Sequence, residues 1–209
     1  MNIIDKLNWR YAVKSFDPDE KLSDDQINTL KEALQLSASS FGLQPYKFVI
    51  VENPELRNKL VDVSYGQDKV AKASHFIIFC IETKLDESFI DRFVDLNVTI
   101  NHLSAENAAG FSGMLKGSIL QRSQEAKEEW SARQLYISIG FLLTSAAVLG
   151  IDACPMEGFD PKAYTEILGL DKLGLRPYAA VALGYRSESD PYQYHKKVRR
   201  PIEDLFVIK

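Results

Sequence analysis

Cationic residues stand in two groups at opposite ends of the sequence. Arg10 and Lys14 lie four residues apart near the N-terminus, and residues 196–200 (KKVRR) form a basic run near the C-terminus. Like charges at helical spacing repel each other by a few tenths of a kcal/mol, roughly. The N-terminal pair is therefore either a solvated basic face or a site that binds an anion.

Two further segments place polar groups in predicted turns. Residues 37–40 (SASS) and the following Gln44 gather hydroxyls and an amide between a helix and a strand. Residues 154–158 (CPMEG) follow a predicted strand, and their proline and glycine fix a backbone shape that can expose N–H groups. Because turns often have this composition, a plain turn and a ligand-binding turn both remain open at each segment.

Several common catalytic patterns are absent from the sequence. The three histidines, His75, His102 and His195, form no HExxH or other compact ligand pattern, so we expect no metal site. There is no GxSxG nucleophile elbow, no phosphate loop of the GxxxxGKS/T type and no GxGxxG after a strand. If a nicotinamide is used, we expect it to bind without a standard dinucleotide fold.

The elements that must position these residues follow from hydrophobic spacing. Ser23 and Gln26 form a capping box for a helix that reaches about Ser37, and Asn53-Pro54 begins another helix after a strand at residues 47–52. Residues 75–82 (HFIIFCIE) are almost entirely apolar, which predicts a central strand buried on both faces. Further strands are expected at residues 151–154 and 178–183, with a short helix from Asp160-Pro161 between them.

Two longer helices and a C-terminal arm complete the predicted elements. Residues 86–109 show amphipathic spacing for one long helix, which three glycines then interrupt. Residues 128–149 are apolar on nearly all sides, so this helix must be covered from several directions, by a large core or a second subunit. The stretch from about residue 186 to residue 209 has too little apolar surface to pack alone and is expected to lie against another chain.

Composition limits the classes of function. The 209 residues are 45% hydrophobic with a net charge of −4, which is typical of one globular domain and argues against general nucleic-acid or anionic-membrane binding. The apolar runs at residues 76–81 and 141–149 are too short to span a bilayer, and the N-terminus lacks the pattern of a secretion signal. We therefore expect a cytoplasmic protein whose Cys80 and Cys154 are buried thiols.

Taken in order, these segments resemble the nitroreductase family over nearly the whole chain. The family's series is R-x-x-x-K-x-F/Y-D, S-x-S-S-x-x-x-Q-P-W/Y, A-S-H before a strand, W-x-x-x-Q in a long helix, P-x-E-G-F-D and K-x-R-x-P. The corresponding positions here are residues 10–17, residues 37–46, residues 73–75, Trp130 with Gln134, residues 155–160 and residues 197–201.

The resemblance implies both a fold and a reaction. The implied fold is α+β, nitroreductase-like, with a central, mostly antiparallel sheet flanked by helices in an intertwined homodimer. One domain would span residues 1–209, with an arm from about residue 186 to residue 209 on the partner subunit. The cofactor would be FMN, the co-substrate NADH or NADPH, and the partner a small-molecule electron acceptor such as a nitroaromatic or quinone, reduced by ping-pong hydride transfer.

The resemblance also implies roles for particular residues. Arg10, Lys197 and Arg199 would bind the FMN phosphate, Lys14 and Lys69 would approach the pyrimidine edge of the flavin, and the backbone amides of residues 157–158 would face flavin N5. No catalytic protein side chain is expected, because the flavin does the chemistry. The implied cofactor-binding residues are Arg10, Tyr11, Ala12, Lys14, Ala38, Ser39, Ser40, Gly42, Gln67, Lys69, Gln134, Pro155, Met156, Glu157, Gly158, Lys197 and Arg199, of which Ser39, Ser40 and Gln134 would come from the partner subunit.

The sequence departs from the family pattern at a few positions. Tyr11-Ala12 replaces the His-Ser of better known members, and Gln67 is assigned in place of an asparagine before the lysine at residue 69. Phe111 and Leu115 are assigned to the substrate gate, although the family's aromatic gate has no clean match there. Alternatives are a dihydropteridine or flavin reductase, a dehalogenating or flavin-cleaving enzyme on the same scaffold, a non-catalytic flavin-binding module, and a plain α+β domain with solvated basic residues.

Overall fold

A four-stranded sheet forms the centre of the computed structural model, which describes residues 2–209. The strands follow the spatial order β1-β2-β4-β3, and each neighbouring pair is antiparallel. Their bounds are β1 Tyr46–Ile50, β2 His75–Glu82, β3 Asp152–Met156 and β4 Leu175–Gly184. The predicted α+β class with a mostly antiparallel sheet is confirmed.

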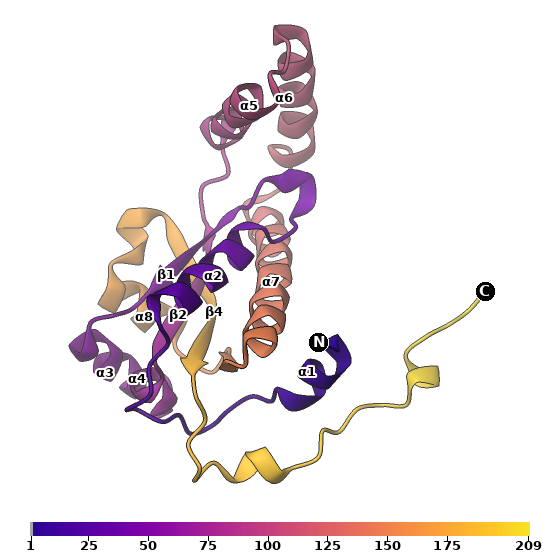
Figure 1. Cartoon of the computed structure of the whole chain (residues 1–209). Coiled ribbons are helices and arrows are strands. Elements are labelled where there is room, and N and C mark those ends of the chain that lie inside the picture. Colours follow the sequence, from indigo (N-terminus) through magenta and orange to yellow (C-terminus); the bar gives the residue numbers. More distant parts are fainter. Residues whose placement is uncertain (1) are drawn as a thin grey trace.

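Helices cover both faces of this sheet (Figure 1). Their bounds are α1 Ile3–Trp9, α2 Asp24–Gln35, α3 Pro54–Asp62, α4 Lys69–Lys72, α5 Glu87–Asn101, α6 Ala105–Ile119, α7 Gln124–Leu149 and α8 Pro161–Leu168. α2 and α7 share one core with Ile77 and Phe79 of β2. α3, α4 and α8 share the other core with Phe76 and Ile78 of the same strand. Alternate side chains of β2 thus enter opposite cores, as its continuous apolar sequence predicts.

The segment between β2 and α7 forms a separate helical pair. Figure 1 shows α5 and α6 projecting beyond the end of the sheet. The prediction of one long helix over residues 86–109 is wrong, because His102 adopts a left-handed conformation (φ 54°, ψ 42°) that ends α5. The Ser104 side chain then accepts a hydrogen bond from the Asn107 amide and starts α6. The three glycines that were expected to interrupt the helix lie inside α6.

α7 is the longest helix, and its apolar residues face in several directions. By length and composition alone it could cross a membrane, but Leu135, Leu142 and Ala146 are fully buried against the sheet, as in a core helix. Other apolar side chains of α7 stay exposed on its outer face. These are Tyr136, Ile137, Phe141, Val148 and Leu149.

The two ends of the chain lie on the same side of the molecule. α1 packs near the C-terminal end of α7, and the arm after β4 passes below α1 and then extends away from the sheet (Figure 1). The arm contains only two short 3-10 turns, η3 Pro191–Tyr194 and η4 Ile202–Asp204. Its last apolar residues, Leu205, Phe206, Val207 and Ile208, are exposed.

Candidate active site

A basic cavity of about 310 Å³ lies where the N-terminal loop meets the C-terminal arm. Both segments contribute cations to it. The basic side chains that line it are Arg10, Lys14, His195, Lys196, Lys197 and Arg199. The Lys197 ammonium donates a hydrogen bond to the Arg10 carbonyl oxygen, so residues separated by 187 positions are in direct contact. The structure thus brings together the cationic groups from the two ends of the sequence.

The cations of this cavity are not neutralised by carboxylates. No ion pair within residues 2–209 includes Arg10, Lys14, Lys197 or Arg199. Burial lowers the pKa of Arg10, and the positive charge of Arg199 lowers it further. The pKa of Lys197 is lowered by burial and then by Arg10 and Arg199. Mutually repelling cations held close together form a surface that an anion would stabilise.

Arg10 also carries an unused hydrogen-bond donor. Its Nε is buried and has no hydrogen-bond partner within the described chain, and the same holds for the Tyr11 hydroxyl. The Tyr11 pKa is raised, first by burial and then by the negative charge of Asp190. A buried donor without a partner costs about 1 to 3 kcal/mol, so an unpaired N–H beside uncompensated charge indicates a place for an acceptor that carries negative charge.

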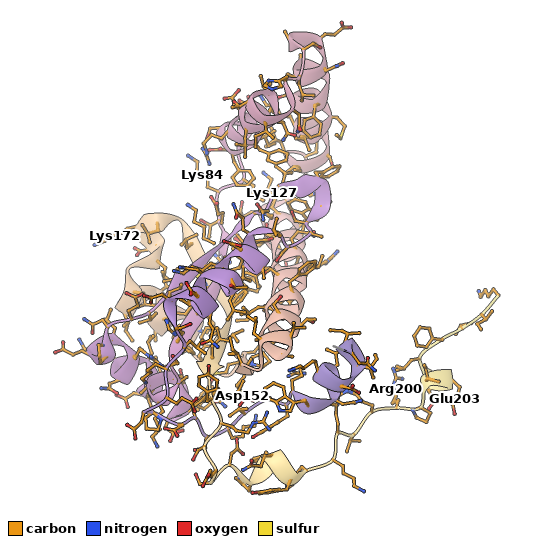
Figure 2. All side chains as sticks on the ribbon, in the orientation of Figure 1. Lys84, Lys127, Asp152, Lys172, Arg200 and Glu203 are labelled. Carbon is orange, nitrogen blue, oxygen red and sulfur yellow. The ribbon has the colours of Figure 1, made fainter. Side chains whose placement is uncertain are left out.

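Arg186 fixes the base of the arm against the N-terminal segment. Its guanidinium makes a bidentate pair with Asp152 of β3, at 2.6 Å from Nη2 to Oδ1 and 2.9 Å from Nε to Oδ2. It also contacts the rings of Trp9 and Tyr11, at 4.5 and 4.6 Å from their centroids. Figure 2 shows Asp152 where the arm leaves the sheet, whereas Arg200 and Glu203 lie far out on the projecting part.

The loop after β3 forms a second part of the site. Ala12 pairs with Ala153 in an isolated parallel bridge, so the N-terminal loop touches β3, whose last residues Pro155 and Met156 lead into the loop at residues 157–158. The Tyr136 hydroxyl donates to Glu157 Oε1 at 2.6 Å. Pro155, Met156 and Glu157 line a cavity of about 250 Å³ together with Tyr136 and two apolar residues.

Gly158 and the segment before α4 hold each other in place. Gln67 Nε2 donates to the Gly158 carbonyl oxygen at 2.7 Å, and a Cβ at residue 158 would lie 3.1 Å from that nitrogen. Gln67 is therefore engaged with the protein backbone and has one amide oxygen left for other contacts. Lys69, two residues later, is buried at the start of α4 with 7% of its surface exposed.

The predicted serine and glutamine positions come together elsewhere. Gln134 of α7 is buried, and its Oε1 accepts a hydrogen bond from the Ser40 amide at 2.8 Å. The Ser39 hydroxyl accepts from the Gln44 amide at 3.1 Å, and Gly42 closes the turn with a left-handed φ of 74°. Ala38 stands just before this turn. This serine turn lies beside the N-terminal half of α7, whereas α1 and the base of the arm lie near its other end (Figure 1).

The two residues assigned to substrate contact lie in the projecting helical pair. Leu115 is fully buried in the core that α5, α6 and the start of α7 share. Phe111 is half-buried and packs against Phe93, with ring centroids 6.1 Å apart. Their assignment to the substrate site stays a prediction, and neither residue lines the two cavities described above.

Sequence reasoning missed several residues of the basic cavity. Tyr192, His195 and Lys196 line it, and Lys14 Nζ lies 6.0 Å from the centroid of the Tyr192 ring. Lys196 belongs to the basic run that the sequence displays, so it could have been included. Tyr192 and His195 carried no such signal, because nothing in the local sequence shows that the arm folds back onto residues 10–14.

Comparison with known proteins identifies the family. The profile described as "Nitroreductase family" matches residues 7–185. "Putative NAD(P)H nitroreductase SH0546" of Staphylococcus haemolyticus is 35% identical over 211 residues, covering 97% of this chain and 95% of that protein. "Putative NAD(P)H nitroreductase YfkO" of Bacillus subtilis is 34% identical over 214 residues, with 97% and 95% covered.

Solved structures share the fold. A "putative nitroreductase ydfN" from Bacillus subtilis superposes with a TM-score of 0.89 at 21% identity, covering 99% of this chain and 98% of that one. A "putative nitroreductase in complex with FMN" from Exiguobacterium sibiricum superposes with a TM-score of 0.87 at 19% identity, with 100% and 98% covered. With a family profile over most of its length and relatives matched almost end to end, this chain belongs to the nitroreductase family.

Proposed function

We propose that this protein is an FMN-dependent NAD(P)H oxidoreductase that reduces nitroaromatics, quinones or similar electron-poor acceptors. The observation that carries the proposal is the cavity in which Arg10, Lys197 and Arg199 meet without a carboxylate, with a buried Arg10 donor left unpaired. A phosphate dianion supplies both the charge and the acceptors that such a cavity lacks. The relatives named as NAD(P)H nitroreductases and the fold neighbour crystallised with FMN support the choice of FMN.

The residues present fit this cofactor. Arg10, Lys197 and Arg199 would hold its phosphate, and Lys14 and Lys69 would place positive charge beside the flavin ring. When bound, FMN supplies a ring that takes up a hydride from a nicotinamide and delivers it to an acceptor.

The other residues of the site would hold and orient the flavin ring. The loop at residues 157–158 is fixed by the Tyr136–Glu157 and Gln67–Gly158 hydrogen bonds, so its backbone amides would stay in one orientation toward the ring. Lysine charge beside the ring would favour the state with more electrons, because that state is more negative. Donor and acceptor would use the same space in turn, which gives ping-pong kinetics.

We propose that the complete site needs two copies of the chain. The serine turn lies beside the N-terminal half of α7, whereas α1, which leads into the basic cavity, packs near the C-terminal end of α7. This separation supports a site assembled from two subunits. Apolar side chains exposed on α7, including Ile137 and Phe141 beside a cavity of about 430 Å³, support a homodimer. The exposed apolar end of the arm would add to that contact.

The proposal includes a location in the cytoplasm and a small molecule as the ligand of the basic cavity. Cys80 and Cys154 are both free thiols, which agrees with a reducing cytoplasm. The net charge of −4 and the gathering of cations in one cavity favour a small anionic cofactor over nucleic acid or a membrane surface.

Anaerobic reduction tests this function. The purified protein should show a flavin spectrum after reconstitution with FMN, and that spectrum should bleach when NADH or NADPH is added. Re-oxidation by a nitroaromatic or a quinone should then restore the spectrum. Double-reciprocal plots of the steady-state rate at several acceptor concentrations should give parallel lines. If neither NADH nor NADPH bleaches the flavin, the proposed oxidoreductase function is contradicted. Bleaching without turnover on any acceptor would indicate a non-catalytic flavin-binding module.

A further inference from the structure

Asp190 is a fully buried carboxylate between the N-terminal loop and the C-terminal arm. None of its surface is exposed. Its Oδ2 accepts hydrogen bonds from the backbone amides of Lys14 at 2.7 Å and Ser15 at 3.1 Å. Its Oδ1 accepts from the backbone amide of Tyr192 at 2.9 Å. One carboxylate thus joins two segments that are 176 positions apart in the sequence.

The charge of Asp190 is balanced by amide dipoles. No ion pair within residues 2–209 includes it, although Arg186 and Tyr11 are close enough to interact electrostatically. Burial alone would raise the pKa of Asp190, but the hydrogen bonds from Ser15, Lys14 and Tyr192 outweigh burial and lower it. The group is therefore ionised at neutral pH and holds these amides by charge-assisted hydrogen bonds.

Asp190 lies between the two segments that carry the phosphate-site cations. Arg10 and Lys14 lie on the loop whose amides it accepts, and Lys197 and Arg199 follow it on the arm. Between Tyr194 and Pro201 the arm has no regular secondary structure, so few contacts besides the Lys197 bond to Arg10 hold it there. A chain of this kind needs a fixed point to keep its cations in one place.

We propose that Asp190 is a positioning residue for phosphate recognition, which aligns the cations of the arm with those of the N-terminal loop. The inference rests on the proposed function, because it takes the phosphate of FMN as the ligand. It predicts that Asp190 controls how strongly the protein prefers FMN over riboflavin, the same ring without the phosphate. A residue that merely stabilised the fold would change the affinity for both flavins alike.

The test compares both flavins on Asp190→Asn. This variant keeps the size and one oxygen acceptor but removes the charge. Binding of FMN and of riboflavin is measured by quenching of flavin fluorescence at one ionic strength. FMN affinity should fall by about tenfold or more while riboflavin affinity changes by less than about twofold. Asp86→Asn is the matched control, since Asp86 also accepts a backbone amide, that of Phe89 at 3.0 Å, but lies at the start of α5.

The test distinguishes failure of the proposed function from failure of the positioning role of Asp190. If the wild-type protein binds neither flavin, or binds both equally, the proposed function fails. If the wild type prefers FMN and Asp190→Asn keeps that preference, the positioning role of Asp190 is overturned while the function stands. Equal losses for both flavins would also overturn it.

A measurement on the wild type covers the case in which the variant does not fold. Hydrogen exchange at the amides of Lys14 and Ser15 is followed without flavin, with saturating FMN and with saturating riboflavin. FMN should slow hydrogen exchange at both amides much more than riboflavin does, because the phosphate fixes the two segments that Asp190 joins. Equal exchange with the two flavins would contradict the proposal.

Discussion

Replacing Arg199 by alanine should have opposite effects on cofactor binding and on the stability of the flavin-free protein. Arg199 is exposed, makes no ion pair within the described residues and lowers the pKa of its neighbours Arg10 and Lys197. Its removal relieves repulsion, so the flavin-free variant should be as stable as the wild type or up to about 1 kcal/mol more stable. By contrast, removal of a side chain that only supported the fold would lower the stability of the flavin-free protein.

The loss in binding should be much larger than this gain. A charge-assisted hydrogen bond to phosphate is worth about 1.5 to 3 kcal/mol, so the Kd for FMN should rise by about 10- to 150-fold. Fluorescence titration at fixed ionic strength gives the Kd, and thermal unfolding without flavin gives the stability. Arg200→Ala is the matched control, because Arg200 carries the same charge one residue later but does not line the cavity. Equal FMN affinity in the two variants would contradict a role for Arg199 in binding the phosphate.

Three further predictions concern other parts of the molecule. Gly158→Ala should lower kcat/KM by about 10- to 100-fold in steady-state assays with little change in FMN affinity, because its Cβ would lie 3.1 Å from Gln67 Nε2 and push aside the side chain that holds the Gly158 carbonyl; an unchanged kcat/KM would contradict this. Leu30→Ala should lower the free energy of unfolding by about 2 to 5 kcal/mol in urea titrations, since Leu30 is fully buried; a loss below 1 kcal/mol, roughly, would mean that the core is looser than described. The pKa of Asp190 is lowered in the folded protein, so its stabilising contribution is fully present above its unfolded pKa of about 4 and is lost as pH falls through the folded value. The difference in free energy of unfolding between the wild type and Asp190→Asn should therefore shrink in acid. A difference that does not depend on pH would argue against this.

Local signals in the sequence predicted the start of several elements correctly. Ser23 and Gln26 form both hydrogen bonds of the expected capping box. Asn53 and Asp160 cap α3 and α8 ahead of a first-turn proline. The apolar run at residues 75–82 is the interior strand β2. These signals succeed because the interactions that define them join residues only a few positions apart.

Interactions between distant residues could not be predicted in this way. The periodicity of residues 86–109 continues across His102, so apolar spacing alone does not reveal that this residue turns left-handed and divides the helix. Asp190 and Arg186 look like ordinary charged residues of a polar arm, but their partners lie in the N-terminal loop and in β3. The assignment of Gln67 as a cofactor ligand comes from resemblance and stays a prediction, whereas the hydrogen bond from its amide nitrogen to Gly158 had no signal in the sequence.

The proposed function depends on cations from both ends of one chain binding a single phosphate. A crystal structure of the protein with FMN tests it most directly. Phosphate oxygens are expected to lie within hydrogen-bond distance of Arg10 Nε and of the Lys197 and Arg199 side chains of the same chain. A flavin phosphate bound elsewhere, with Arg10 and Arg199 still in contact only with protein or water, would contradict it.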